Sequence, residues 1–148
     1  LSIAILSYYV SLFRVSQVEV CMLEALKALG DESRLRIVHL LLYGPLCVCE
    51  LEYVLQMSQT NVSRHLAKLK QAKIVQSVKQ GQWVNYQMDG MFLANEGMLI
   101  EYLKGNFVND MSFQEDLSSL LNHQVDWNAC LTPSRKELQE KLSHKGVV

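Results

Sequence analysis

The sequence predicts a mainly α-helical fold that carries one small β-hairpin. Over most of residues 22–121, apolar residues recur at helical spacing between recognisable caps and turns. Between residues 74 and 86 the spacing changes to alternation around a turn that contains Gly81, which is typical of two paired strands. Hydrophobic residues make up 49% of the 148 residues, enough for one compact core and a helical extension.

Residues 1–21 are set apart as an N-terminal segment. They have neither the basic start of a signal peptide nor the uncharged run of a membrane span, because Arg14 interrupts the apolar stretch. The chain begins at Leu1, and Met22 opens the first clear helix. We therefore expect this segment to be an added piece or a mis-assigned start. Four cysteines are too few and too unevenly spaced for a disulfide framework, which favours a reduced, cytoplasmic protein with no membrane partner.

Four helices are expected before the hairpin. They cover residues 22–29, residues 31–42 up to the stop at Gly44 and Pro45, residues from about 47 to 57, and a stretch that begins after Ser58. The Ser58 hydroxyl can accept from the free amides that open this fourth helix. The buried face of the fourth helix is expected to carry Val62, Leu66 and Leu69.

Beyond the hairpin, the pattern predicts a helix over residues 91–104. A second helix should open at Ser112, which forms a capping box with Glu115, and a more polar one near Pro133. No internal repeat is present.

The polar face of the fourth helix has the residue types that read DNA. From Tyr53 to Met88 the chain has no acidic residue and five basic ones, whereas all fifteen acidic residues lie elsewhere. Such asymmetry marks a surface that meets phosphate, although a solvated basic face is the simpler alternative. Short groups near the helix start can bond base edges, and longer cations can reach bases or phosphates. The candidate contacts on this helix are Gln59, Thr60, Asn61, Ser63, Arg64, His65 and Lys68.

Two short helices, a turn and a basic hairpin together predict a winged helix-turn-helix. Lys79, Gln80 and Gln82 at the hairpin tip are assigned to sugar-phosphate contacts, whereas Trp83 and Tyr86 are expected to pack against the helices. One such module reads few base pairs, so useful specificity requires a homodimer on duplex operator DNA. We expect the helices at 22–29 and 91–104 to form the dimer surface.

Cys47 and Cys49 are the one cluster of soft ligands in the sequence. In a regular helix, residues two positions apart point about 200° away from each other, so their sulfurs could not share an ion. Here the pair falls at a helix start just after Gly44 and Pro45, where the backbone can depart from helical angles. Ligand binding would then distort the helix that packs on the DNA-reading helix. Taken alone the pair is weak evidence, since small buried cysteines are common.

Residues 23–88 resemble the ArsR/SmtB (arsenic-repressor) family of bacterial transcriptional regulators. The resemblance rests on three stretches in matching order, at residues 26–37, at residues 46–51, and at residues 63–66 together with 81–86. It implies a homodimeric repressor of a resistance operon that releases DNA when metal binds. The resemblance also implies that Cys47 and Cys49 are the metal ligands.

Two departures from the family pattern bear on the inducer. Arsenic-sensing members often carry a third cysteine where this chain has Glu52, so a third sulfur would come from Cys21 or Cys130. Zinc-sensing members use a histidine that is missing near Asp89, which argues against zinc sensing at that helix. Ligation by thiolates alone favours As(III) or Sb(III) first and Cd(II) or Pb(II) second.

Three other functions would leave different signs in the sequence or in experiments. A thiol redox or persulfide sensor would use the same cysteines and would be reversed by a reductant rather than by a chelator. An enzyme with a cysteine nucleophile is disfavoured, because no histidine with an acidic partner and no phosphate loop accompanies the pair. A winged module used only for protein contacts would lack DNA affinity that falls with salt. The predicted organisation is an N-terminal segment at 1–21, a DNA-binding and dimerisation domain at 22–105, and a C-terminal helical extension at 106–148.

Overall fold

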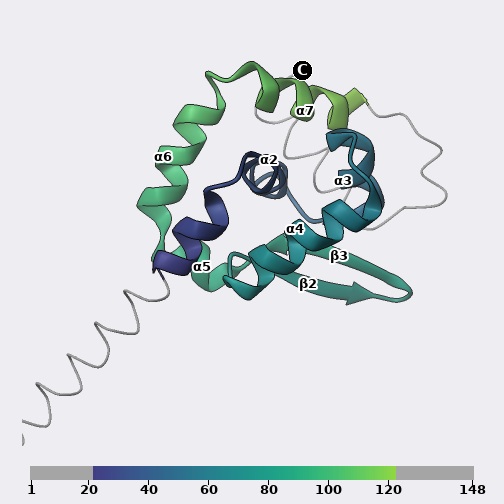
Figure 1. Ribbon diagram of the computed structural model, residues 1–148, viewed down its shortest axis with the longest axis horizontal. Helices are drawn as coiled ribbons and strands as arrows, with labels where there is room; N and C mark the ends of the chain where they lie inside the picture. Colours follow the sequence, from purple (N-terminus) through teal and green to yellow (C-terminus); the bar gives the residue numbers. More distant parts are fainter. Residues whose placement is uncertain (1–21, 123–148) are drawn as a thin grey trace, which may run out of the picture.

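The computed structural model describes residues 22–122, which form a body of helices with the β-hairpin at one edge, beside the fourth helix (Figure 1). The order of elements agrees with the fold expected from the sequence, a winged helix-turn-helix that is mainly α. In chain order, the elements are helical residues 22–29, α2 (Glu32–Leu41), β1 (Leu46–Cys47), α3 (Val48–Leu55), α4 (Gln59–Gln71), β2 (Val75–Gln80), β3 (Trp83–Met88), α5 (Gly90–Asn95), α6 (Gly97–Phe107) and α7 (Met111–Asn122).

The core lies where α2, α3 and α4 meet the sheet. Its least exposed side chains are aliphatic and come from every one of these elements, which explains the regular apolar spacing of the sequence. The predicted cap at Ser58 is present, since its side chain accepts from the Asn61 amide at 3.4 Å. The Asp31 side chain caps α2 in the same way by accepting from the Arg34 amide at 3.0 Å. The fully buried aliphatic residues include Ile37, Leu40, Leu46, Leu51, Val62, Leu66, Leu69 and Ile74.

The sheet has three antiparallel strands in the order β1-β3-β2. The hairpin strands meet at a turn where Gly81 has a φ of 61°, a conformation that glycine adopts without strain. The pairing of a third strand, β1, was not predicted, since the sequence pattern indicated only a helix that begins at about residue 47 with a start free to depart from helical angles. Leu46 and Cys47 instead pair with Tyr86 and Asn85, which joins the start of α3 to the hairpin.

The region after the hairpin differs from the prediction in two places. The single helix expected over residues 91–104 is divided into α5 and α6 at Glu96, whose φ of −110° and ψ of 31° are not helical. The start of α7 is capped by Asp110 rather than by Ser112: the Asp110 carboxylate accepts from the Ser112 amide at 2.9 Å. The negative charge of Asp110 also suits the positive end of the helix dipole, and α7 begins at Met111. None of the helices within residues 22–122 could cross a bilayer.

Helix α7 packs against both α2 and α3. Its buried Asp116 accepts two hydrogen bonds of 2.6 Å from the Arg36 guanidinium on α2. Beside this pair, the ring of His39 meets Phe107 and Phe113 with centroids 4.9 and 5.5 Å away. The predicted division of the chain after residue 105 falls within α6, and the assignment of residues 106–148 as a C-terminal extension stays a prediction.

Candidate nucleic-acid interface and thiol site

Helix α4 presents one apolar and one polar face. Val62, Leu66 and Leu69 are fully buried, so the helix is fixed on the core and cannot rotate to hide its polar residues. The exposed face also carries an internal contact, because Arg64 Nη2 donates to Asn61 Oδ1 at 2.7 Å. Six of the seven residues predicted to contact DNA from this helix are exposed: Gln59, Thr60, Asn61, Ser63, Arg64 and Lys68.

His65 is the exception on this helix. Its side chain is only 14% exposed, and Nδ1 lies 3.7 Å from an Asp31 carboxylate oxygen at the start of α2. Burial lowers the pKa of His65, while the Asp31 charge acts in the opposite direction. Arg34, held by backbone carbonyls of Ala28 and Lys27, adds a further positive charge nearby. His65 thus faces the core side of the helix, and its role as a DNA contact stays a prediction.

The hairpin extends the exposed surface of α4. Lys79, Gln80 and Gln82 are all exposed at its tip, as expected for backbone contacts. The hairpin is tied to α4 by Lys70, whose ammonium donates to the Ser77 hydroxyl on β2 at 2.7 Å. The helix and the hairpin therefore present one surface whose geometry fits a helix in the major groove with a wing beside it.

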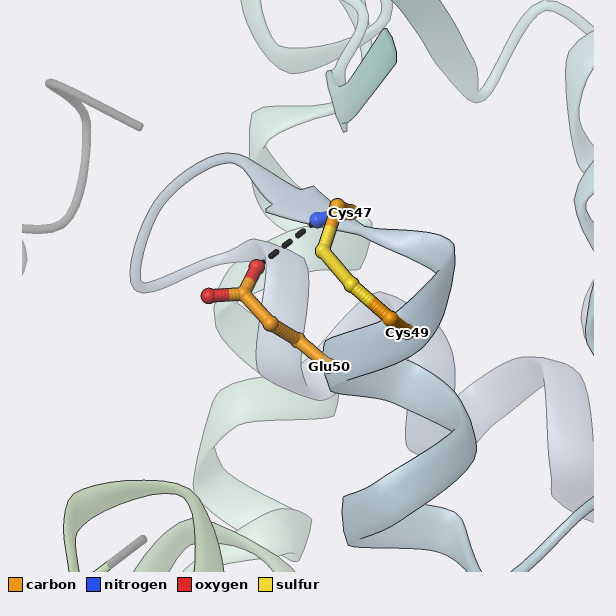
Figure 2. The surroundings of a disulfide bond; sticks show 3 residues. All are labelled: Cys47, Cys49 and Glu50. Atoms are coloured by element: carbon orange, nitrogen blue, oxygen red, sulfur yellow. Dashed lines mark hydrogen bonds between the residues drawn. A yellow bond between two sulfur atoms is a disulfide. The ribbon is translucent and has the colours of Figure 1, made fainter. Parts of the chain in front are cut away.

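Cys47 and Cys49 lie at the junction of β1 and α3, and their sulfurs are joined in a disulfide (Figure 2). Cys47 is the N-cap of α3 with extended angles, φ −86° and ψ 168°, so it stands outside the helix. This departure from helical geometry brings together two sulfurs that a continuous helix would hold apart. Cys47 is buried at 4% exposure, whereas Cys49 is exposed.

Glu50 fixes this turn and was not singled out from the sequence. Its buried carboxylate accepts from the Cys47 amide at 2.8 Å, as Figure 2 shows. A carboxylate that reaches back from the third helical position to the N-cap amide is one half of a capping box. The spacing Cys-x-x-Glu was the signal in the sequence, with cysteine where serine or threonine is usual.

One family of known proteins matches the part of the chain that contains both the thiol site and the exposed helix α4. Residues 31–77 match the sequence model of a family described as "Bacterial regulatory protein, arsR family". The chain belongs to the ArsR family. The matched residues include both cysteines and the whole of α4.

Several curated relatives are regulators whose names refer to arsenic or cadmium resistance. The chain is 46% identical over 63 residues to an arsenic resistance transcriptional regulator of Pseudomonas putida, covering 42% of this chain and 49% of that protein. It is 46% identical over 67 residues to the arsenical resistance operon repressor of Escherichia coli, covering 45% and 57%. A cadmium resistance transcriptional regulatory protein, CadC of Listeria innocua, is 39% identical over 70 residues, covering 47% and 59%. The match thus spans about half the length of these curated relatives, all of which are regulators rather than enzymes.

Solved structures share the fold. Reduced HlyU from Vibrio cholerae has a TM-score of 0.52 at 31% identity, covering 61% of this chain and 95% of that one. The homodimeric winged helix-turn-helix DNA-binding domain of a Mycobacterium bovis protein, described as "a possible ArsR-family transcriptional regulator", has a TM-score of 0.55 at 25% identity, covering 62% of this chain and 85% of that one. The sequence-based assignment to the ArsR family and its fold is therefore confirmed.

The described residues of this ArsR-family chain supply two sulfurs to the thiol site. Within residues 22–122, no three histidine, cysteine or acidic side chains are grouped so that they could hold a metal ion. Cys21 and Cys130, the predicted sources of a third sulfur, lie outside the described residues. Asp89, near the position that zinc sensors use, caps α5 by accepting from the Met91 amide at 2.9 Å and the Phe92 amide at 3.1 Å.

Proposed function

We propose that this protein is a transcriptional repressor that binds operator DNA as a homodimer and leaves it when arsenite or antimonite bonds to Cys47 and Cys49. The observation that carries the proposal is the position of Cys47 between β1 and α3. β1 pairs with the hairpin strand β3, and α3 packs on α4. A change at this one residue can therefore reach both parts of the DNA-binding surface.

The DNA contacts divide by side-chain type. On α4, the short polar groups near the helix start suit base edges, and Arg64 and Lys68 suit bases or phosphates. On the hairpin, Lys79, Gln80 and Gln82 suit the sugar-phosphate backbone beside the groove. Their exposure supports these roles, whereas the contact of His65 with Asp31 favours a part in positioning α4 on α2.

The homodimer would form through residues 22–29 and α6. Both carry large apolar side chains that the single chain leaves in solvent, which marks an interaction surface. The homodimeric relative from Mycobacterium bovis supports this assembly. The exposed large apolar residues of these two helices are Met22 at 49%, Leu23 at 52%, Leu26 at 46%, Met98 at 91% and Tyr102 at 69%.

The inducer is proposed from the chemistry of the cysteine pair. In the reduced protein, two neighbouring thiols select thiophilic ions, and exposed Cys49 gives the ligand access to buried Cys47. The arsenic resistance relatives favour As(III) or Sb(III), and the CadC relative keeps Cd(II) and Pb(II) as the next candidates. A third sulfur would come from Cys21 or Cys130 of the same or the partner subunit. The proposed mechanism needs reduced thiols, which supports a proposed location in the cytoplasm, where cysteines are kept reduced.

The test is binding of the reduced full-length protein to its own upstream promoter DNA, titrated with arsenite. The wild type should bind with an affinity that falls steeply with salt, and arsenite should release it. The variant with Cys47→Ser and Cys49→Ser should bind DNA equally well and stay bound. Antimonite, cadmium and lead titrations on the same complex rank the inducers.

Two further variants make the test specific. Cys21→Ser and Cys130→Ser should each be compared with the wild type, and the one that weakens arsenite binding supplies the third sulfur. DNA binding by the wild type that arsenite leaves unchanged would contradict the proposed inducer, and DNA binding without salt dependence would contradict the proposed interface.

The disulfide supports a second candidate function, a repressor that senses thiol oxidation. The Cα atoms of Cys47 and Cys49 are 5.5 Å apart, within the range that disulfides span. A small-molecule thiol would reduce the bond to two cysteine thiols and would itself be oxidised to a disulfide. Under this alternative, promoter affinity changes on oxidation and returns with a reductant, whereas arsenite has no effect on the reduced protein.

A further inference from the structure

Asn85 lies beside the sensor cysteine in the sheet. It is 2% exposed in the middle strand β3 and pairs directly with Cys47 of β1. Residues directly opposite in an antiparallel pair project to the same face, with Cβ atoms about 4.5–5.5 Å apart. The carboxamide of Asn85 is thus a near neighbour of the buried Cys47 side chain.

The other end of the same carboxamide points to the hairpin tip. Asn85 Nδ2 donates to Gln80 Oε1 at 3.2 Å. Gln80 is exposed at the end of β2, within the surface proposed to contact the DNA backbone. One side chain therefore connects the neighbourhood of Cys47 with a proposed DNA contact.

The Asn85 carbonyl oxygen is buried and has no hydrogen-bond partner within residues 22–122. A buried acceptor without a donor costs free energy, so native structures seldom keep one. In the disulfide form, Cys47 has no S–H group to offer. Reduction gives Cys47 a thiol, which is a weak donor next to this acceptor.

We propose that Asn85 is a positioning residue that transmits the state of Cys47 to Gln80 on the hairpin. The inference rests on the proposed release by arsenite and names a path for it. In the reduced protein, the Cys47 thiol donates to Asn85 Oδ1 and holds the carboxamide with its amide group toward Gln80. The hairpin tip is then ordered for the DNA backbone.

Arsenite binding removes that donor. Arsenous acid condenses with the two thiols: two S–H and two As–O bonds break, two As–S bonds form, and two water molecules leave. Cys47 then has no proton to donate, so the carboxamide of Asn85 is no longer held. Gln80 loses its fixed position, and the contact of the hairpin with DNA weakens together with that of α4.

The test compares promoter affinity with and without arsenite for the reduced full-length chain. The variants are Asn85→Leu, which keeps a similar volume without polar atoms, and Gln80→Ala at an exposed position. The matched control is Gln82→Ala, a neighbouring exposed glutamine on the same hairpin tip. Each of the first two should reduce the arsenite-induced loss of DNA affinity by roughly three- to tenfold. The number of thiols that arsenite protects from alkylation should stay unchanged.

Two more readouts separate this role from a merely structural one. Combining Asn85→Leu with Gln80→Ala should give no larger effect than either alone, because both interrupt the same path. The S–H stretching band of Cys47 in infrared difference spectra should shift in Asn85→Leu and stay unchanged in Gln82→Ala.

The outcomes distinguish the inference from the proposed function. If arsenite releases the wild type but both variants keep the full effect, the path through Asn85 is wrong and the repressor stands. An equal loss of coupling in Gln82→Ala would also overturn the path. If arsenite fails to release the wild type, both proposals fall. Should Asn85→Leu not fold, Gln80→Ala alone decides the question.

Discussion

Two surfaces of the same helical core use polar residues in opposite ways. On the α4 and hairpin side, the polar residues are exposed and point away from the core. On the α7 side, Arg36, His39 and Asp116 are turned inward, and Asp116 is 4% exposed. Residue type alone does not distinguish the two sets in the amino-acid sequence.

This difference shows which polar residues serve the fold and which are available for a partner. A buried charge must be paired, so its partner is found within the chain. A DNA-binding group gains nothing from burial, because its partner arrives from outside. Substitutions on the α7 side should therefore reduce stability, and substitutions on the α4 side should reduce DNA affinity.

The largest effect is expected from Arg36→Ala. The change leaves the Asp116 carboxylate buried without its partner, which typically costs about 3–5 kcal/mol. Urea unfolding followed by circular dichroism measures this loss. The matched control is Lys104→Ala, which breaks the exposed 2.7 Å pair with Glu101 and should cost less than about 1 kcal/mol. Equal losses in the two variants would contradict the contrast between buried and exposed pairs.

Arg64→Ala tests the opposite surface. Arg64 is exposed and, within residues 22–122, its side chain bonds to Asn61 on its own helix, so the free energy of unfolding should barely change. Promoter affinity should fall by about 1–3 kcal/mol, with relaxed preference for the base pair that Arg64 contacts. Arsenite affinity should be retained. A variant that loses arsenite binding together with DNA binding would refute the division of roles.

Lys79→Ala tests the hairpin tip. If Lys79 contacts phosphate, the variant should bind all DNA sequences more weakly by a similar factor. The slope of log affinity against log salt should become shallower by about 1. Anisotropy titrations over a salt series measure both quantities. An unchanged slope would remove Lys79 from the interface.

The smallest effect is expected from pH. Burial lowers the pKa of His39 from its ordinary value of 6.5, against smaller raising effects of a backbone hydrogen bond at Phe113 and of Asp116. At a pH between the unfolded and the folded pKa of His39, the unfolded chain binds more protons than the folded one. The contribution of His39 to stability is therefore full above the unfolded pKa and is lost as the pH falls toward the folded pKa. His39→Phe should flatten this fall between about pH 7.5 and about pH 5.5. His65, whose pKa is also lowered by burial, should contribute to the slope that remains.

The local patterns of the sequence predicted much of this structure. Helical spacing, the cap at Ser58 and the glycine turn of the hairpin are all short-range signals. They yielded the fold and the exposed face of α4. The extended backbone at Cys47 could also be expected, because it follows Gly44 and Pro45 closely.

The missed features depend on contacts between distant residues. The pairing of Cys47 with Asn85 and of Arg36 with Asp116 joins positions far apart in the chain, and no local period encodes either. The surroundings of His65 are a similar case, because helical spacing gives its position on α4 but does not reveal that its ring lies near Asp31. The third sulfur ligand of the proposed ion, Cys21 or Cys130, cannot be chosen from local patterns for the same reason.

The most direct test of the central claim is thermodynamic reciprocity between arsenite and DNA. Arsenite affinity should be measured for the reduced protein free in solution and saturated with promoter DNA. If Cys47 and Cys49 control release, arsenite binds more weakly on DNA by the same factor by which arsenite weakens DNA binding. Equal arsenite affinities in the two states would contradict the account.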